Sequence, residues 1–408
     1  MRVRVLQAST LGELLVGLVP AAGAQDSPTD YAQWRGRTRD GSASAFEAPV
    51  QWPDTLTRHW AVEVGEGYAT PLVVGETVYT FTRHRGDEVA TALSAATGEV
   101  LWRTAYAAPY EPFSGTARHG DGPKATPLFH GGRLYTHGIA GAVSAFDGAS
   151  GAVVWQIPAP DGQPLFGTSV SPVAHGDRVM LHPGYGPLTA FDAATGEVAW
   201  TTGDQGLWAS PVIAELDGVK QVISVAYQVI EGVSLADGAL LWDYPINREE
   251  VHAVTPLVYD GMVLVTGQDS GVKALRPRRR DGVWSVSVVW ETDEVAMELS
   301  NPVLVGDAVF GLSHRSAGQY FVLDARTGVV RWRGAPREAD NTAVVKADDL
   351  LLLLNDDAEM IVGRLSGAGL ERIRSYTVAD SATWAQPAVS GNRIFIKDVD
   401  TLTLWTVD

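Results

Sequence analysis

The sequence predicts an all-β fold: an eight-bladed β-propeller of four-stranded antiparallel blades, closed by the N-terminal strand. Two recurring phrases and their number support this prediction. The first phrase, Ala-x-x-Ala-x-Thr/Ser-Gly-x-x-x-Trp, returns about every 44 residues. A period in the 40s that combines turns with alternating strands is typical of propeller blades. The clearest copies lie at 92–102, 145–155, 190–200, 234–242 and 322–332.

The Thr-Gly or Asp-Gly step of this phrase predicts a tight hairpin turn, because glycine adopts positive φ without strain. The three residues that follow place a tryptophan at a fixed point on the outer strand. A large flat ring at that point can dock between blades and bury about 200 Å². We therefore interpret seven tryptophans as interblade packing residues rather than a binding cage: Trp60, Trp102, Trp155, Trp200, Trp242, Trp290 and Trp332.

The second phrase precedes the first and consists of a small residue, a proline and a Val/Leu-rich strand. It runs from ATPLVVGETVY at Ala69 to AQPAVSGNRIF at Ala385. Residues 57–408 divide into eight units of about 44 residues, and the last unit lacks a fourth strand. The isolated strand at 57–64 is expected to complete that blade, because closure removes both free sheet edges.

Three segments follow from this count: residues 1–24, 25–56 and 57–408. The first has basic residues, an apolar stretch and a small-x-small site at Ala22–Ala24, so it is expected to be a signal peptide. The second is expected to be an irregular leader laid over one face of the propeller and pinned by Trp34 and Trp52. The third is the propeller itself.

Two units depart from the repeat. In the fifth, the usual turn is replaced by LRPRRRDGVWS, whose charge run we place in a hairpin loop. That run is either a solvated tip or, on an acidic protein, a docking site for an anionic partner. The seventh unit has lost both its proline and its closing tryptophan and is expected to be the least regular blade. The arginines of the fifth unit are Arg276, Arg278, Arg279 and Arg280.

Composition excludes several functional classes. The chain has no cysteine, so disulfides, thiolate metal sites, a cysteine nucleophile and a lipoprotein anchor are not expected. Its net charge of −17 disfavours binding to a phosphate backbone, and nucleic acid is not an expected partner. No run of 18 apolar residues is present, so no membrane-spanning helix is expected.

No catalytic or metal-binding motif is recognisable, and we assign neither catalytic residues nor metal ligands. A site, if present, is expected at the channel mouth, near the residues that precede each repeat proline. That mixed set suits a small polar or aromatic ligand, but side chains that plug a channel would look the same. The candidates are Tyr68, Lys124, Ser169, Trp208, His252, Asn301, Asn341 and Trp384.

The repeats resemble those of quinoprotein-like (PQQ-binding-like) eight-bladed propellers, whose phrase is A-x-D-x-x-T-G-x-x-x-W. Residues 190–200, AFDAATGEVAW, match it at every informative place. The leader, with Trp34-Arg35-Gly36 and Asp40-Gly41, is similar to the opening of secreted members of this group. The likeness covers about 370 of the 408 residues. It implies the fold, and it leaves enzymes and interaction proteins as alternatives.

The quinoprotein dehydrogenases of this superfamily hold PQQ under a Cys-Cys disulfide, with an aspartate base and Ca²⁺. This chain cannot form that disulfide, and its sequence carries no motif that would place the base or the Ca²⁺ ligands. The BamB-type members are non-catalytic subunits of the outer-membrane β-barrel assembly machine. They are normally lipoproteins, and the missing cysteine departs from that pattern.

We therefore expect a non-catalytic, monomeric propeller, periplasmic or secreted from a bacterium, without a bound cofactor. It would serve as a protein-binding or envelope-assembly scaffold, with an envelope or secreted protein as partner. The alternative is a PQQ- or metal-dependent oxidoreductase with its site at the channel mouth.

Overall fold

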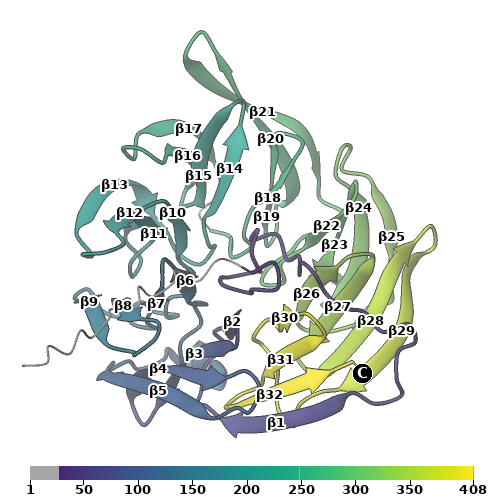
Figure 1. Ribbon diagram of the computed structural model, residues 1–408. Coiled ribbons are helices and arrows are strands. Elements are labelled where there is room, and N and C mark those ends of the chain that lie inside the picture. The colour runs from purple at the N-terminus through teal and green to yellow at the C-terminus, as the bar shows by residue number, and fades with distance from the viewer. Residues whose placement is uncertain (1–26, 248, 408) are drawn as a thin grey trace, which may run out of the picture.

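The computed structural model describes residues 27–247 and 249–407, so the predicted signal peptide lies outside the described residues. Eight four-stranded antiparallel sheets are arranged as blades around a central axis (Figure 1). Two short 3₁₀ helices, η1 (Ser114–His119) and η2 (Arg315–Ala317), lie in connections between strands. The predicted all-β propeller with eight blades is confirmed.

Each of the first four blades runs outward from a short inner strand to an exposed outer strand. Their strands are β2 (Leu72–Val74), β3 (Thr77–His84), β4 (Asp87–Ser94) and β5 (Val100–Ala107) in blade 1; β6 (Leu128–His130), β7 (Arg133–His137), β8 (Val143–Asp147) and β9 (Val153–Ile157) in blade 2; β10 (Val173–His175), β11 (Arg178–Leu181), β12 (Pro187–Asp192) and β13 (Val198–Gln205) in blade 3; and β14 (Val212–Leu216), β15 (Val219–Val225), β16 (Val229–Ser234) and β17 (Leu240–Pro245) in blade 4.

Blades 5 to 7 repeat this order, and blade 8 takes its outer strand from the start of the propeller. Their strands are β18 (Leu257–Tyr259), β19 (Met262–Gly267), β20 (Gly271–Arg280) and β21 (Val283–Thr292) in blade 5; β22 (Val303–Val305), β23 (Ala308–Ser313), β24 (Gln319–Asp324) and β25 (Val330–Arg333) in blade 6; β26 (Thr342–Ala347), β27 (Leu350–Asn355), β28 (Glu359–Ser366) and β29 (Gly369–Thr377) in blade 7; and β30 (Ala388–Ser390), β31 (Arg393–Lys397), β32 (Thr401–Thr406) and β1 (Thr57–Glu63) in blade 8.

The ring closes through β1, as the sequence predicts. β1 pairs antiparallel with the C-terminal strand β32, with Val62 opposite Leu402. The pairing satisfies backbone groups that would otherwise lie unpaired at two sheet edges. The middle strands β3 and β4 are buried on both faces, whereas β5 alternates between exposed and half-buried residues. The core therefore lies between blades and between the middle strands.

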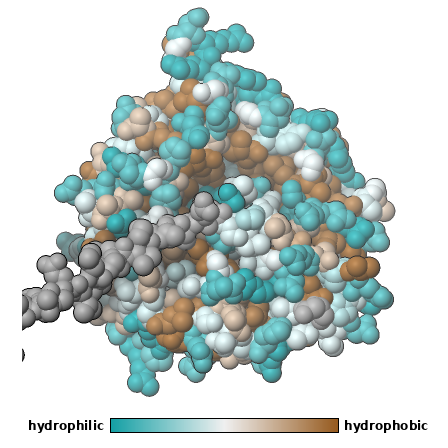
Figure 2. All heavy atoms as spheres, in the orientation of Figure 1, coloured by the Kyte–Doolittle hydropathy of each residue, from teal (hydrophilic) through white to brown (hydrophobic). Residues whose placement is uncertain are grey.

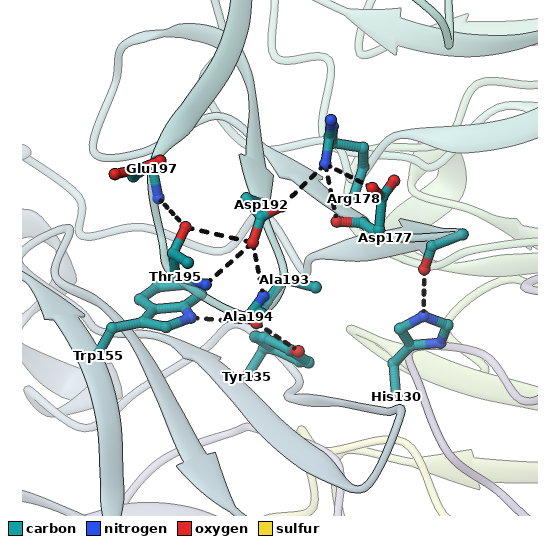
Figure 3. Close-up of polar contacts among 11 residues, drawn as sticks. His130, Tyr135, Trp155, Asp177, Arg178, Asp192, Ala193, Ala194, Thr195 and Glu197 are labelled. Carbon is teal, nitrogen blue, oxygen red and sulfur yellow. Dashed lines mark hydrogen bonds and ion pairs between the residues drawn. The ribbon is translucent and has the colours of Figure 1, made fainter.

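Figure 3 shows how a repeat tryptophan joins two blades. The indole Nε1 of Trp155 in blade 2 donates to the carbonyl of Ala193 in blade 3 at 3.1 Å, and the Tyr135 hydroxyl donates to the same carbonyl at 2.9 Å. Gly196 in the turn has φ 75°, and a Cβ there would lie 2.7 Å from Trp155 Cδ2. The turn needs glycine both for its backbone conformation and because the indole lies against it.

The same indole-on-glycine contact recurs around the ring, but not at Trp242. The Trp242 Nε1 donates to Gln221 Oε1 of its own blade at 2.5 Å, because the next blade carries a long hairpin in place of the Thr-Gly turn. The recurring pairs are Trp60 with Gly98, Trp102 with Gly151, Trp200 with Gly238, Trp290 with Gly328 and Trp332 with Gly369.

Two expectations for the divergent units are wrong. The arginines of blade 5 do not lie in a loop, because β20 continues to Arg280 and only Asp281 and Gly282 form the turn. Blade 7 is not irregular: its inner strand β26 has six residues, and β27 is buried throughout. In blade 7, leucine packing and hydrogen bonds from the leader stabilise the unit where the repeat proline and tryptophan are missing.

Candidate functional site

The leader enters the central channel instead of only covering one face (Figure 1, purple). Tyr31 forms a β-bridge with Val73 of blade 1, and the Phe129 N–H of blade 2 donates to the Ala32 carbonyl at 2.8 Å. The Ala43 N–H donates to the Lys346 carbonyl of blade 7 at 2.8 Å. Residues 31–43, the channel segment, therefore form backbone hydrogen bonds with the inner strands of blades 1, 2 and 7.

Two tryptophans hold the leader in place. The Trp34 Nε1 donates to Thr255 Oγ1 of blade 5 at 3.0 Å. Trp52 is buried, stacks on Phe46 and lies 6.4 Å from the ring of Tyr376. The Tyr376 hydroxyl donates to the Pro53 carbonyl at 2.7 Å. Both residues named from the sequence thus contact the propeller.

Two arginines of the channel segment are buried among backbone carbonyls. Arg35 is 0% exposed and donates to the carbonyls of Pro302 and Asp40. Arg39 is 4% exposed and donates to the Pro172 carbonyl at 2.8 Å and to that of Ser171. Burial lowers the pKa of Arg35 to about 10 and that of Arg39 to about 9. Both stay charged at neutral pH, because carbonyl oxygens replace the lost water.

Two glycines make this path possible. Gly36 has φ 79°, and a Cβ there would lie 2.5 Å from the Ser42 carbonyl oxygen. Gly41 has φ 83°, and its Cβ would meet Val303 at 2.6 Å. Sequence reasoning did not place the two arginines in the channel. The sequence signal for this path was the pair of motifs Trp34-Arg35-Gly36 and Asp40-Gly41. Their glycines indicate a backbone that adopts positive φ where a side chain would not fit.

The Ser/Thr before the repeat proline links neighbouring blades around the axis. The Thr126 N–H donates to Ser171 Oγ at 2.9 Å, and the Ser171 N–H donates to Ser210 Oγ at 2.9 Å. The Thr70 N–H donates to Thr126 Oγ1 at 3.1 Å. Asn301 makes the equivalent link between blades 5 and 6, where its Oδ1 accepts a hydrogen bond from the Thr255 N–H at 2.8 Å. The small polar residue of the second phrase is therefore structural.

Five of the eight mouth candidates stand three residues before a repeat proline, and they form two groups. Tyr68 and Trp384, from the ends of the ring that meet, have ring centroids 6.0 Å apart, and His119 packs edge-on against Trp384 at 4.7 Å. In the second group Trp208 packs on Phe166 at 5.9 Å.

Lys124 and Ser169 belong to the second group. The Lys124 Nζ donates to the Phe166 carbonyl at 2.8 Å, and Ser169 Oγ donates to the Trp208 carbonyl at 3.1 Å. Burial lowers the pKa of Lys124. Binding of a ligand by either group stays a prediction.

The other three candidates do not share that position. Asn301 directly precedes its proline. Asn341 is buried and accepts a hydrogen bond from Ser300 Oγ at 2.7 Å. His252 faces the carbonyls of Thr266 and Asn247 at 3.1 and 3.0 Å. The structure thus does not bring all eight residues to one space.

His252 instead lines a cavity of about 300 Å³ between blades 4 and 5. Its walls include Ile230 and Val265, and its polar side includes Glu250. Burial raises the pKa of Glu250, but hydrogen bonds from Ser270 and Asn247 outweigh it and lower that pKa overall. Its carboxylate is therefore already engaged with the protein.

Within residues 27–247 and 249–407, no group of three or more His, Asp or Glu side chains is placed to hold a metal ion. No helix in the same part of the chain is long and apolar enough to cross a membrane.

The fold and the repeat define the class of protein: an eight-bladed propeller built from quinoprotein-type repeats with interblade tryptophans. Within that class, the family described as outer membrane protein assembly factor BamB matches residues 39–228 and 208–408. The chain belongs to this family. A search of curated proteins finds no significant match.

Solved structures of both functional kinds share the fold. BamB from Moraxella catarrhalis is 17% identical, with a TM-score of 0.63 over 86% of this chain and 98% of that one. The quinohemoprotein alcohol dehydrogenase from Comamonas testosteroni is 13% identical, with a TM-score of 0.65 over 95% of this chain and 81% of that one. The computationally designed Ika8 protein is 12% identical, with a TM-score of 0.60 over 88% of this chain and 100% of that one. At these identities the likeness concerns the fold alone.

Proposed function

We propose that this protein is a non-catalytic scaffold of the bacterial envelope that binds other proteins and takes part in outer-membrane protein assembly. The observation that carries the proposal is the channel segment, whose buried Arg35 and Arg39 bind carbonyls of the surrounding blades. A propeller whose axis is occupied by its own chain presents its faces and its perimeter to partners. Membership of the BamB family supports the same role.

The mouth residues offer no pair of parallel rings between which a flat quinone cofactor such as PQQ could stack. Tyr68 and Trp384 are tilted by 32° with ring centroids 6.0 Å apart, and His119 stands at 89° to Trp384 and at 84° to Tyr68. The neighbouring axial space holds the channel segment. We assign no cofactor and derive no redox step. The alternative, a quinone-dependent dehydrogenase, is supported by the shared fold. No arrangement of side chains among the described residues supports it.

Localisation and partners can be tested in one experiment. We expect the tagged full-length chain, expressed in a bacterium, to fractionate with the periplasm. After crosslinking in intact cells, it should co-purify with subunits of the β-barrel assembly machinery. A cytoplasmic location, or co-purification with a c-type cytochrome and none of those subunits, would contradict the proposal.

A further inference from the structure

The hairpin of blade 5 is the largest departure from the repeat. Its strands β20 and β21 have ten residues each and extend beyond the other blades at the top of Figure 1. Asp281 and Gly282 join them with φ 49° and 83°, the two positive values of a type I′ turn. Figure 2 shows this projection as mainly hydrophilic, in contrast to the apolar surface nearer the axis.

One face of the hairpin carries arginines beside small residues. Arg280 lies opposite Val283, and Arg278 lies opposite Ser285. Opposite residues of an antiparallel pair project to the same face. Arg278 and Arg280 are exposed. The Arg278 guanidinium pairs with Asp217 of blade 4 at 3.1 Å, whereas no hydrogen bond or ion pair among the described residues uses the Arg280 side chain. The small neighbours leave space beside the guanidinium groups.

The other face carries the exposed Arg279 near the turn and is otherwise apolar and turned toward the protein. Trp284 and Val286 are half-buried and pack against the core between blades 4 and 5. The backbone at the inner edge is anchored as well, because the Arg279 N–H donates to Asp217 Oδ2 of blade 4 at 2.7 Å. The hairpin is therefore held in position and not merely extended into solvent.

The outer edge of β21 is open for another strand. β21 is the last strand of its sheet, and residues 283–290, VWSVSVVW, contain neither charge nor proline. Natural edge strands usually carry such residues to prevent pairing. Glu291, the charged residue of β21, lies beyond this run of eight residues. The uncharged runs of the other outer strands of more than five residues are shorter, because of residues such as Arg103 in β5, Asp204 in β13, Asp243 in β17 and Glu371 in β29.

The turn fixes which backbone groups face outward. In a type I′ hairpin the residues that flank the turn, here Arg280 and Val283, form a hydrogen-bonded pair. The next pair, Arg279 and Trp284, then directs its backbone N–H and C=O groups away from the partner strand. The hydrogen bond from the Arg279 N–H to Asp217 agrees with this alternation. Trp284, Val286 and Val288 accordingly present their N–H and C=O groups at the open edge.

We infer that β21 is a docking edge for an extended segment of a partner protein in which acidic and apolar residues alternate. This inference rests on the proposed scaffold function. The added strand would pair with the backbone of β21, its carboxylates facing Arg280 and its apolar side chains beside Trp284. Charge complementarity selects this partner, because Arg280 presents an exposed guanidinium with no ion pair among the described residues, on a chain of net charge −17.

Two other occupants fit less well. A second copy of this hairpin would bring arginines against arginines. A membrane would require exposed aromatic side chains at the tip, and Trp284 is instead packed against the core.

The test uses the full-length protein and a short synthetic peptide that alternates glutamate and valine, with a lysine–valine peptide as the charge control. We expect the acidic peptide to bind and to slow amide exchange at Trp284, Val286 and Val288, leaving Ser285 unchanged. Arg280→Glu should weaken binding by about tenfold or more. The matched variant Arg279→Glu, on the opposite face, should change it by less than about threefold.

Val288→Pro provides a second variant, since it removes an outward N–H at an exposed position without breaking the β20–β21 ladder. We expect it to melt like the wild type and to lose peptide binding. Equal binding of both peptides, equal effects of both arginine variants, or binding to phosphatidylglycerol vesicles without peptide binding would overturn the inference. If wild type and Arg280→Glu retain the same crosslinked assembly subunits, the docking edge is wrong while the scaffold proposal stands.

Discussion

The junction between blades 2 and 3 and the junction between blades 4 and 5 use the same tryptophan position in different ways. At the first, Trp155 lies on Gly196 and donates to Ala193 of the next blade (Figure 3). At the second, Trp242 donates to Gln221 of its own blade. The difference teaches that the indole packed on the turn requires a short turn with glycine at that position. Where the indole contact is lost, the hairpin is free to lengthen and carry a surface of its own.

The two blades also differ in the pair of side chains beside the tryptophan. In blade 2, Gln156 donates to Ser144 Oγ at 2.9 Å, a neutral pair. At the same place in blade 4, Glu231 lies opposite Asp243. Glu231 is 1% exposed, and its Oε1 has no partner among the described residues. Blade 4 therefore contains a buried carboxyl group that the regular junction avoids.

The largest expected effect is at a regular indole. Trp200→Ala should lower the free energy of unfolding by about 3–5 kcal/mol, because it leaves a cavity between blades 3 and 4. The control is Trp208→Ala, which alters a half-buried ring at the channel mouth and should cost much less. Chemical denaturation of the three proteins measures both values. Equal losses would show that the two tryptophans do not differ in role.

The turn glycine gives the next effect. Gly196→Ala should cost about 3 kcal/mol, because a Cβ there combines positive-φ strain with displacement of Trp155. Gly282→Ala, at φ 83° with no atom within 4 Å of the new Cβ, should cost about 1 kcal/mol from strain alone. Urea unfolding measures the difference. If the two costs match, the indole does not select glycine.

The buried carboxyl group of blade 4 predicts a pH effect. Burial, followed by Asp204 and Asp243, raises the pKa of Glu231 to about 7. Because this pKa is raised in the folded state, the protonated Glu231 contributes its full stabilisation of the fold at low pH. That contribution is lost as pH rises through about 7. Glu231→Gln should therefore stabilise the protein by about 2 kcal/mol at pH 8 and by little at pH 4. Thermal melts that show the same gain at both pH values would contradict this.

The smallest effect is expected where blade 4 holds the hairpin. Asp217 pairs with the Arg278 guanidinium at 3.1 Å and accepts from the Arg279 N–H. Asp217→Asn should leave the melting temperature nearly unchanged, because exposed ion pairs contribute little. The Arg279 amide should nevertheless exchange faster. Unchanged exchange would mean that Asp217 does not anchor the inner edge.

The repeat made the architecture predictable, because spacing, turn glycines and tryptophans all report the same periodic contacts. The closure of the ring could be predicted by counting strands, because the strand at 57–64 had no other strands before it and the last unit lacked a fourth strand. Blade 7 was misjudged because a buried leucine strand can replace the repeat residues, and Leu350 to Leu354 carry no turn signal. The channel segment could not be predicted from periodicity. Arg35 and Arg39 resemble surface arginines in sequence, and only the surrounding carbonyls explain their burial.

The most direct test of the central claim is titration of the purified protein with PQQ and Ca²⁺. Tryptophan fluorescence would report binding, and an artificial electron acceptor would report turnover on an alcohol or a sugar. A channel filled by residues 31–43 predicts no saturable fluorescence change and no dye reduction. Micromolar binding that is lost in Trp208→Ala or Trp384→Ala, together with dye reduction, would contradict the scaffold account.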